Sequence, residues 1–179
     1  PNYAFAYRLR GAIRSRTGRN EEALRDFEVV GRLRPNDSEN HKDRGGVLVR
    51  MNRNDEALAE LDRALAIDPR NAKAYQNRGA AYNNLRRYAE AVADLDRAID
   101  LDPKNAGART NCGLALFMLG EYERSLEDLG EAVKLAPRNA IVHFNRGNVY
   151  AKLGLRDQAM ADYRAVEEAD PRLLASYGG

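Results

Sequence analysis

The sequence of 179 residues has no tryptophan, one cysteine and two histidines. The single cysteine, Cys112, excludes an internal disulfide and a zinc site built from several cysteines. The two histidines, His41 and His143, are too few to form a histidine metal cluster by themselves. The longest unbroken apolar run, residues 114–119, has six residues. Because a membrane-spanning helix needs about 20 apolar residues, we expect no membrane insertion.

Proline is also scarce, but its positions are informative. The six prolines each lie 34 residues from the next: Pro1, Pro35, Pro69, Pro103, Pro137 and Pro171. A fixed period of this length indicates a repeat architecture. Aligning the chain with itself gives five copies, at residues 4–37, 38–71, 72–105, 106–139 and 140–173. With positions in each copy numbered from 1 to 34, proline occupies position 32.

Other residue types recur with the proline. Position 8 is always glycine, at Gly11, Gly45, Gly79, Gly113 and Gly147. Position 20 is alanine or serine, and position 24 is leucine or an aromatic residue. Within each copy the apolar residues recur at spacings of three and four, which is typical of helices and not of strands. Small residues at positions 8, 20 and 27 allow two helices to approach closely.

This pattern resembles the tetratricopeptide repeat family, most clearly in the third copy. That copy carries the family's residues at the expected positions: Tyr75, Gly79, Tyr82, Ala91, Leu95, Ala98 and Pro103. The resemblance implies an all-α fold, a right-handed superhelical α-solenoid of helix-turn-helix repeats. We expect first helices near residues 4–16, 39–51, 73–85, 107–119 and 141–153. A second helix follows in each copy, for example at residues 88–100. The turn before it carries a residue that tolerates a left-handed conformation in every copy but the third, which has Arg86.

The register predicts one array over residues 1–179. Residues 174–179 then begin a truncated sixth repeat, and the chain is a window from a longer superhelix. The exposed terminal repeats predict self-association with other copies, since solenoid ends usually need a cap.

Position 7 departs from the family, because four copies carry arginine there. Each of these copies has a carboxylate at position 23, which predicts the ion pairs Arg10–Asp26, Arg44–Glu60, Arg78–Asp94 and Arg146–Asp162. The alternative is a ladder of anion-binding residues. The fourth copy has Cys112 with Asp128, and we expect Cys112 to be a small packed side chain.

In this family, positions 2, 5, 6, 9, 12 and 13 line a concave groove. Position 6 carries Asn77, Asn111 and Asn145 in three consecutive copies. Their amides can both donate to and accept from the main chain of an extended peptide. The pattern is similar to the asparagine ladder of O-linked N-acetylglucosamine transferases. The alternative is that these residues only solvate the groove or cap nearby carbonyls.

Further groove positions predict a mixed surface. The polar and basic candidates for peptide binding are Arg8, Lys42, Lys73, Gln76 and Asn148, and the apolar ones are Leu114, Phe117, Ile141 and Phe144. Packing between repeats is the alternative for Phe117 and Ile141. No window of the chain completes the two-carboxylate clamp by which a subset of the family binds acidic C-terminal peptides.

The sequence therefore predicts a non-catalytic scaffold that binds a partner segment in the groove. The alternative is a regulatory, targeting or oligomerisation module of a larger enzyme. The net charge is only +2, so we expect no nucleic-acid binding. Residues 1–50 carry eleven bases and seven acids, and this basic end can receive an acidic segment of a partner. The alternative is a solvated helix face together with a contact to a preceding repeat. No metal, cofactor or catalytic residue is expected, and a cytoplasmic location is the working assumption.

Overall fold

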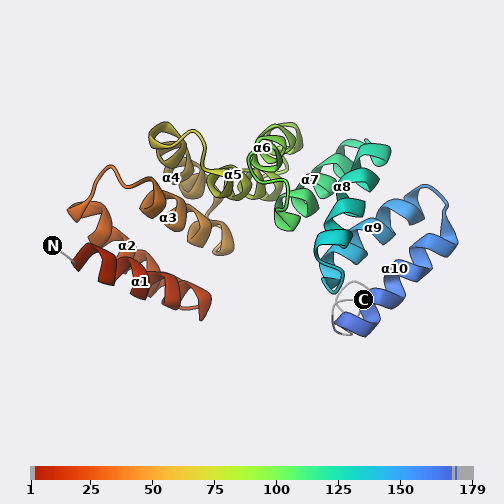
Figure 1. Cartoon of the computed structure of the whole chain (residues 1–179), viewed down its shortest axis with the longest axis horizontal. Coiled ribbons are helices and arrows are strands. Elements are labelled where there is room, and N and C mark those ends of the chain that lie inside the picture. Colours follow the sequence, from red (N-terminus) through yellow and green to blue (C-terminus); the bar gives the residue numbers. More distant parts are fainter. Residues whose placement is uncertain (1–2, 171, 173–179) are drawn as a thin grey trace. The chain divides into compact units, whose positions relative to one another are not determined.

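The computed structural model describes residues 3–170 and 172, and in this part of the chain it is entirely helical, without strands. Two helices form each repeat, close to the predicted bounds, and Figure 1 shows them coloured along the chain. The ten helices are α1 (Tyr3–Arg16), α2 (Asn20–Leu33), α3 (Ser38–Arg50), α4 (Asn54–Ile67), α5 (Ala72–Asn84), α6 (Tyr88–Leu101), α7 (Ala106–Leu119), α8 (Tyr122–Leu135), α9 (Ala140–Lys152) and α10 (Arg156–Ala169). The predicted sixth copy, residues 174–179, lies outside the described residues, and none of the described helices is long and apolar enough to cross a membrane.

The first helix of each later repeat begins at a capping residue in position 34. The side-chain oxygens of Asp37, Asn71 and Asn105 each accept a hydrogen bond of 3.0 Å from the backbone N–H three residues later. Asn139 does the same for the N–H two residues later. Each cap satisfies one of the backbone donors that a helix start leaves unpaired. Proline at position 32 and the cap at position 34 together fix where one repeat ends and the next begins.

The turn between the two helices of a repeat has a left-handed residue at the same position in all five copies. These residues are Gly18, Asn52, Arg86, Gly120 and Gly154, with φ between 58° and 83°. Arg86 adopts this conformation with φ 60°, although a side chain there costs about 1 kcal/mol. The repeat geometry therefore imposes the turn even where the sequence does not favour it.

Position 8 glycine allows the two helices of a repeat to touch. A Cβ atom at Gly45 would lie 2.5 Å from Leu61 Cγ, and one at Gly113 would lie 2.5 Å from Leu129 Cγ. At Gly11 the nearest atom would be in the Phe27 ring at 2.8 Å. These distances are shorter than van der Waals contact, so the position tolerates no side chain. The close helix approach predicted from the small residues is confirmed at these sites.

The chain divides into two compact units, residues 1–87 (unit 1) and 88–179 (unit 2), with the boundary in the third repeat. In unit 1 the core lies between neighbouring helix pairs and includes Phe27, Val47 and Leu61. In unit 2 a core cluster contains Leu129, Ala132, Val142 and Val149. A single array over the whole chain stays a prediction.

Three of the predicted ion pairs form. Arg10 donates through Nε and Nη2 to Asp26 at 3.0 and 2.7 Å, and Arg146 donates in the same way to Asp162 at 2.8 and 2.7 Å. Arg44 Nη1 lies 3.3 Å from Glu60. Arg78 donates to Asp62 of α4 at 2.7 Å, and its predicted pair with Asp94 would join the two units and is not tested. Cys112 is fully buried, as expected.

Candidate functional site

The exposed sides of α1, α3 and α5 in unit 1 carry two adjoining hollows of about 230 and 260 Å³. Both are lined by Ala12 and Asp43, and we call them together the unit 1 groove. The other lining residues lie on the first helices of three repeats, except Phe27, which lies on α2. They are Phe5, Arg8, Leu9, Ser15, Arg16, Glu39, Lys42, Gly46, Arg50, Lys73 and Asn77. The groove therefore lies on the face that the family resemblance predicts.

Small residues at position 9 make room in the groove. These are Ala12 on α1 and Gly46 on α3. A Cβ atom at Gly46 would lie 2.8 Å from Asn77 Nδ2, so the absence of a side chain lets the Asn77 amide lie directly against α3. An amide placed in this way at the floor of a groove can donate to and accept from a bound main chain.

The acidic residues of the groove are paired with Lys42. Its Nζ lies 2.8 Å from Glu39 Oε2 and 3.0 Å from Asp43 Oδ1. Burial opposes the charged form of Lys42, but the hydrogen bond to Glu39 and the charge of Asp43 outweigh it and raise the pKa of Lys42. Burial likewise opposes ionisation of Glu39, and the hydrogen bond from Lys42 prevails and lowers the pKa of Glu39. Lys42 and Glu39 are thus charged at neutral pH.

Four of the five predicted residues of unit 1 line this groove, and the fifth, Gln76, bonds to one of them. Arg8, Lys42, Lys73 and Asn77 line it, and Gln76 accepts a hydrogen bond of 2.7 Å from Lys73 Nζ. The prediction omitted Arg16 and Arg50, although both occupy position 13, which the family pattern assigns to the groove. Arg50 also donates to the Ser15 hydroxyl.

The predicted polar residues of unit 2 lie on α7 and α9. Asn111 and Asn145 are half-buried at position 6, and Asn148 accepts a hydrogen bond of 2.8 Å from the Tyr163 hydroxyl. Asn77 belongs to unit 1 and the other two rungs to unit 2, so a continuous ladder stays a prediction.

The predicted apolar residues of unit 2 differ in exposure. Phe117 packs against the unit 2 core cluster, with its ring 5.8 Å from that of Tyr122, and the Phe144 ring lies 6.4 Å from Tyr163. Leu114 is half-buried, whereas Ile141 is 54% exposed. Ile141 therefore offers more free surface to a partner than Phe117 does.

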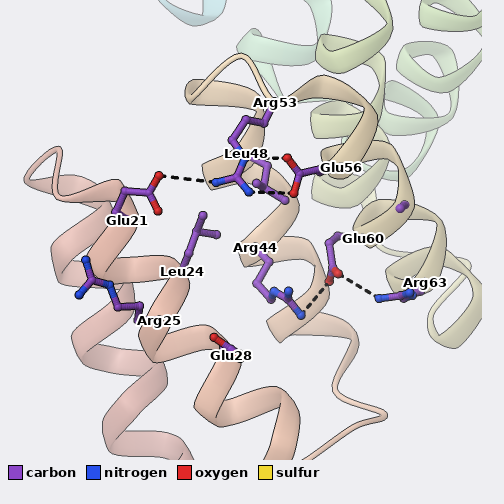
Figure 2. Close-up of a pocket in the computed structure, with 11 residues that line it drawn as sticks. Glu21, Leu24, Arg25, Glu28, Arg44, Leu48, Arg53, Glu56, Glu60 and Arg63 are labelled. Atoms are coloured by element: carbon purple, nitrogen blue, oxygen red, sulfur yellow. Dashed lines mark hydrogen bonds and ion pairs between the residues drawn. The ribbon is translucent and has the colours of Figure 1, made fainter.

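A separate hollow of about 360 Å³ lies between α2 and α4, and Figure 2 shows the residues that line it. We call it the charged cleft. It is lined by four arginines and four glutamates: Arg25, Arg44, Arg53, Arg63, Glu21, Glu28, Glu56 and Glu60. Arg53 pairs with Glu56 at 2.7 Å and with Glu21 at 3.6 Å, and Arg63 pairs with Glu60 at 3.0 Å. Its charges balance and are largely paired, so it does not attract ligands of one sign.

Sequence reasoning missed the role of position 4. His41 Nδ1 lies 2.8 Å from Glu60, the position 23 carboxylate, and its Nε2 lies 3.1 Å from the Pro35 carbonyl oxygen. His143 repeats this with Asp162 at 2.7 Å and Pro137 at 3.0 Å. In the fourth copy Arg109 bonds to Asp128 at 3.0 Å and to the Pro103 carbonyl at 3.3 Å. A nitrogen donor at position 4 in three copies was the available signal.

Cys112 lies between two carboxylates. Its Sγ is 3.6 Å from Asp96 Oδ1, and the ligand atoms of Asp96, Cys112 and Asp128 lie within 4.8 Å of one another. This set has the atoms to hold a metal ion. However, burial, followed by the charge of Asp128, raises the pKa of the Cys112 thiol, and only a thiolate is a good nucleophile or metal ligand. Asp128 is paired with Arg109, so the geometry favours a packed thiol.

Three sequence models of one family match the chain. Two are described as tetratricopeptide repeat, at residues 46–110 and 140–173, and one as TPR repeat, at residues 115–154. Together they cover well over half of the chain. No curated protein sequence matches the chain significantly.

Solved structures with this fold include MamA 41-end from Desulfovibrio magneticus RS-1, which is 25% identical with a TM-score of 0.80 over 96% of this chain and 97% of that chain. MamA MSR-1 C2 is 26% identical with a TM-score of 0.73 over 96% and 99% of the two chains. TTC0263, a thermophilic TPR protein in Thermus thermophilus, is 23% identical with a TM-score of 0.81 over 96% and 94%. The last of these supports the fold alone.

Proposed function

Because the chain belongs to the tetratricopeptide repeat family, whose arrays serve as protein-interaction scaffolds, we propose that it binds an extended partner segment in the groove of its first helices. The observation that carries this proposal is the unit 1 groove. Three first helices contribute to it, small side chains keep it open, and an amide lies at its floor. A groove of this kind suits an extended main chain, whose peptide groups need both donors and acceptors.

The proposed role of Asn77, Asn111 and Asn145 is to hold that main chain. Each hydrogen bond contributes about 1 kcal/mol, which corresponds to about a fivefold change in affinity. A peptide array should be screened with the natural chain, and the best peptides measured against each single Asn→Ala variant and the triple variant. We expect each single variant to bind the peptides more weakly than the natural chain, and the triple variant to bind them most weakly.

The matched control is Asn36→Ala, at an exposed asparagine in the loop between α2 and α3 and outside the groove. It should leave every affinity unchanged. Equal binding by the natural chain and the triple variant would refute the amide ladder.

Self-association is a second part of the proposal. Position 10 is fully buried in four repeats, at Val47, Ala81, Ala115 and Val149, but Ile13 on α1 is 48% exposed. The same helix face that packs against a neighbour elsewhere is thus uncovered on α1, and we propose that a second copy covers it. Light scattering at millimolar concentration should show association that Ile13→Asp reduces. A strictly monomeric natural chain would contradict this.

A further inference from the structure

The unit 1 groove carries an excess of positive charge. Five cationic side chains line it, Arg8, Arg16, Lys42, Arg50 and Lys73, against two carboxylates, Glu39 and Asp43. At neutral pH the charged residues of the groove therefore sum to +3.

Both carboxylates of the groove are already used. Lys42 lies 2.8 Å from Glu39 and 3.0 Å from Asp43, so a single lysine takes both of them. Arg50 donates to the neutral Ser15 hydroxyl, and no carboxylate among the described residues forms an ion pair with Arg16 or Arg50. These two arginines occupy position 13 of adjacent repeats, so they extend from neighbouring helices into one groove.

The charged cleft shows that this excess is not shared by every hollow of unit 1. The cleft has four arginines and four glutamates, and Arg53, Arg44 and Arg63 lie in ion pairs (Figure 2). The groove and the cleft share no lining residue. Of these two hollows, the groove is therefore the one that attracts a ligand of one sign.

We propose that the unit 1 groove selects a partner segment that carries two or more Asp or Glu side chains within an extended stretch, and that Arg16 and Arg50 contact those carboxylates. Guanidinium groups suit this task, since they bind carboxylates through two parallel hydrogen bonds. The carboxylates belong to internal side chains, so a free C-terminus is not required. This inference rests on the proposed groove-binding function.

The test compares three peptides of eight residues, blocked at both ends, with alanine alternating with Glu, Gln or Lys. Affinity for the full chain is measured by fluorescence anisotropy at about 50 and 300 mM salt. We expect the Glu peptide to bind about tenfold more tightly than the Gln peptide at low salt, with a smaller ratio at high salt. A single-stranded oligonucleotide of equal charge should bind more weakly than the Glu peptide, and tighter binding would overturn the proposal.

Two double variants locate the interaction. Arg16→Gln with Arg50→Gln should reduce affinity for the Glu peptide about tenfold and leave the Gln peptide unchanged. Arg25→Gln with Arg32→Gln removes the same charge from exposed α2 residues outside the groove and should have little effect. Arg50→Glu should shift the preference toward the Lys peptide, and circular dichroism checks that each variant is helical.

The outcomes separate the two proposals. If no peptide binds, groove binding itself is wrong. If the Glu and Gln peptides bind equally well, the groove remains a peptide site and its acidic selectivity is wrong. Equal losses in the two double variants would also overturn the assignment to Arg16 and Arg50.

Discussion

Asp26 in unit 1 and Asp128 in unit 2 occupy the same repeat position, yet their surroundings shift their ionisation in opposite directions. Burial raises the pKa of both carboxyls, but at Asp26 the hydrogen bonds from Arg10 and Arg14 prevail and lower it. At Asp128, burial prevails and raises the pKa, although the hydrogen bond from Cys112 and the charge of Arg109 oppose it. The difference begins at position 7, where the first copy has Arg10 and the fourth copy has Cys112. The helix framework thus tolerates a change in polar contacts that reverses the direction of the carboxyl pKa shift.

The exposed faces of the first helices also differ between the two units, in the charge of their side chains. In unit 1 they carry Arg16, Lys42 and Arg50, whereas α7 and α9 carry Phe117 and Ile141 at other positions of the same face. Prolines, glycines and caps keep the repeat constant, and the face is free to vary in charge and polarity.

The largest expected effect on stability concerns the glycine at position 8, which both units share. Gly45→Ala in unit 1 and Gly113→Ala in unit 2 should each lower the free energy of unfolding by about 3 kcal/mol, because the added methyl group overlaps Leu61 or Leu129. Urea unfolding of the full chain measures both. Gly130→Ala is the control, since open space surrounds that position on α8, and it should stabilise by about 0.5–1 kcal/mol. A cost below about 1 kcal/mol at Gly45 would show that the helices simply move apart.

The next effect concerns Asp26. Asp26→Asn removes the charge that Arg10 and Arg14 both bind, at 2.7–3.0 Å, and we expect a loss of about 2 kcal/mol in the free energy of unfolding at pH 7. Because the folded pKa of Asp26 is lowered, this contribution exists above the unfolded pKa and disappears as the pH falls through the folded value. The difference in the free energy of unfolding between the natural chain and the variant should therefore disappear at acidic pH.

Asp128→Asn should have a smaller effect, of less than about 1 kcal/mol at pH 7, because the change also removes a buried charge. The raised folded pKa of Asp128 reverses the sign: the natural chain loses stability relative to the variant as the pH rises through the folded value. Urea unfolding between pH 4 and 7 should show opposite slopes for the two variants. If the stability difference from the natural chain changed with pH in the same direction for both variants, the opposite pKa shifts of Asp26 and Asp128 would be wrong.

The smallest expected signal comes from Cys112. Burial raises the pKa of its thiol, so a thiol reagent at pH 8 should react with the native chain far more slowly than with the urea-unfolded chain. Native and unfolded rates that agree within about twofold would mean that unit 2 opens readily around Asp96 and Asp128.

The residue pattern predicted the helix bounds within one or two residues, because proline, glycine and caps recur in fixed register. It also predicted Arg10–Asp26 and Arg146–Asp162, since a half-buried arginine at position 7 needs a carboxylate partner and position 23 supplies one in each copy. The left-handed turn at Arg86 was not predicted, because its side chain does not favour that conformation and the neighbouring helices impose it. The hydrogen bonds of His41 and His143 were missed because one partner is a backbone carbonyl: the sequence shows the nitrogen-bearing side chains at position 4, but not the carbonyl oxygen that they reach.

The bonds of position 4 also define the part of a repeat that can be exchanged intact. In three copies one side chain joins the proline carbonyl of the preceding loop to the position 23 carboxylate, over residues 35–60, 103–128 and 137–162. A graft of residues 38–71 would carry His41 and Glu60 into a new loop, and the imidazole would bond only if that loop placed its carbonyl identically. Gene shuffling or protein design should therefore cut within the second half of a second helix, where no such bond crosses the junction.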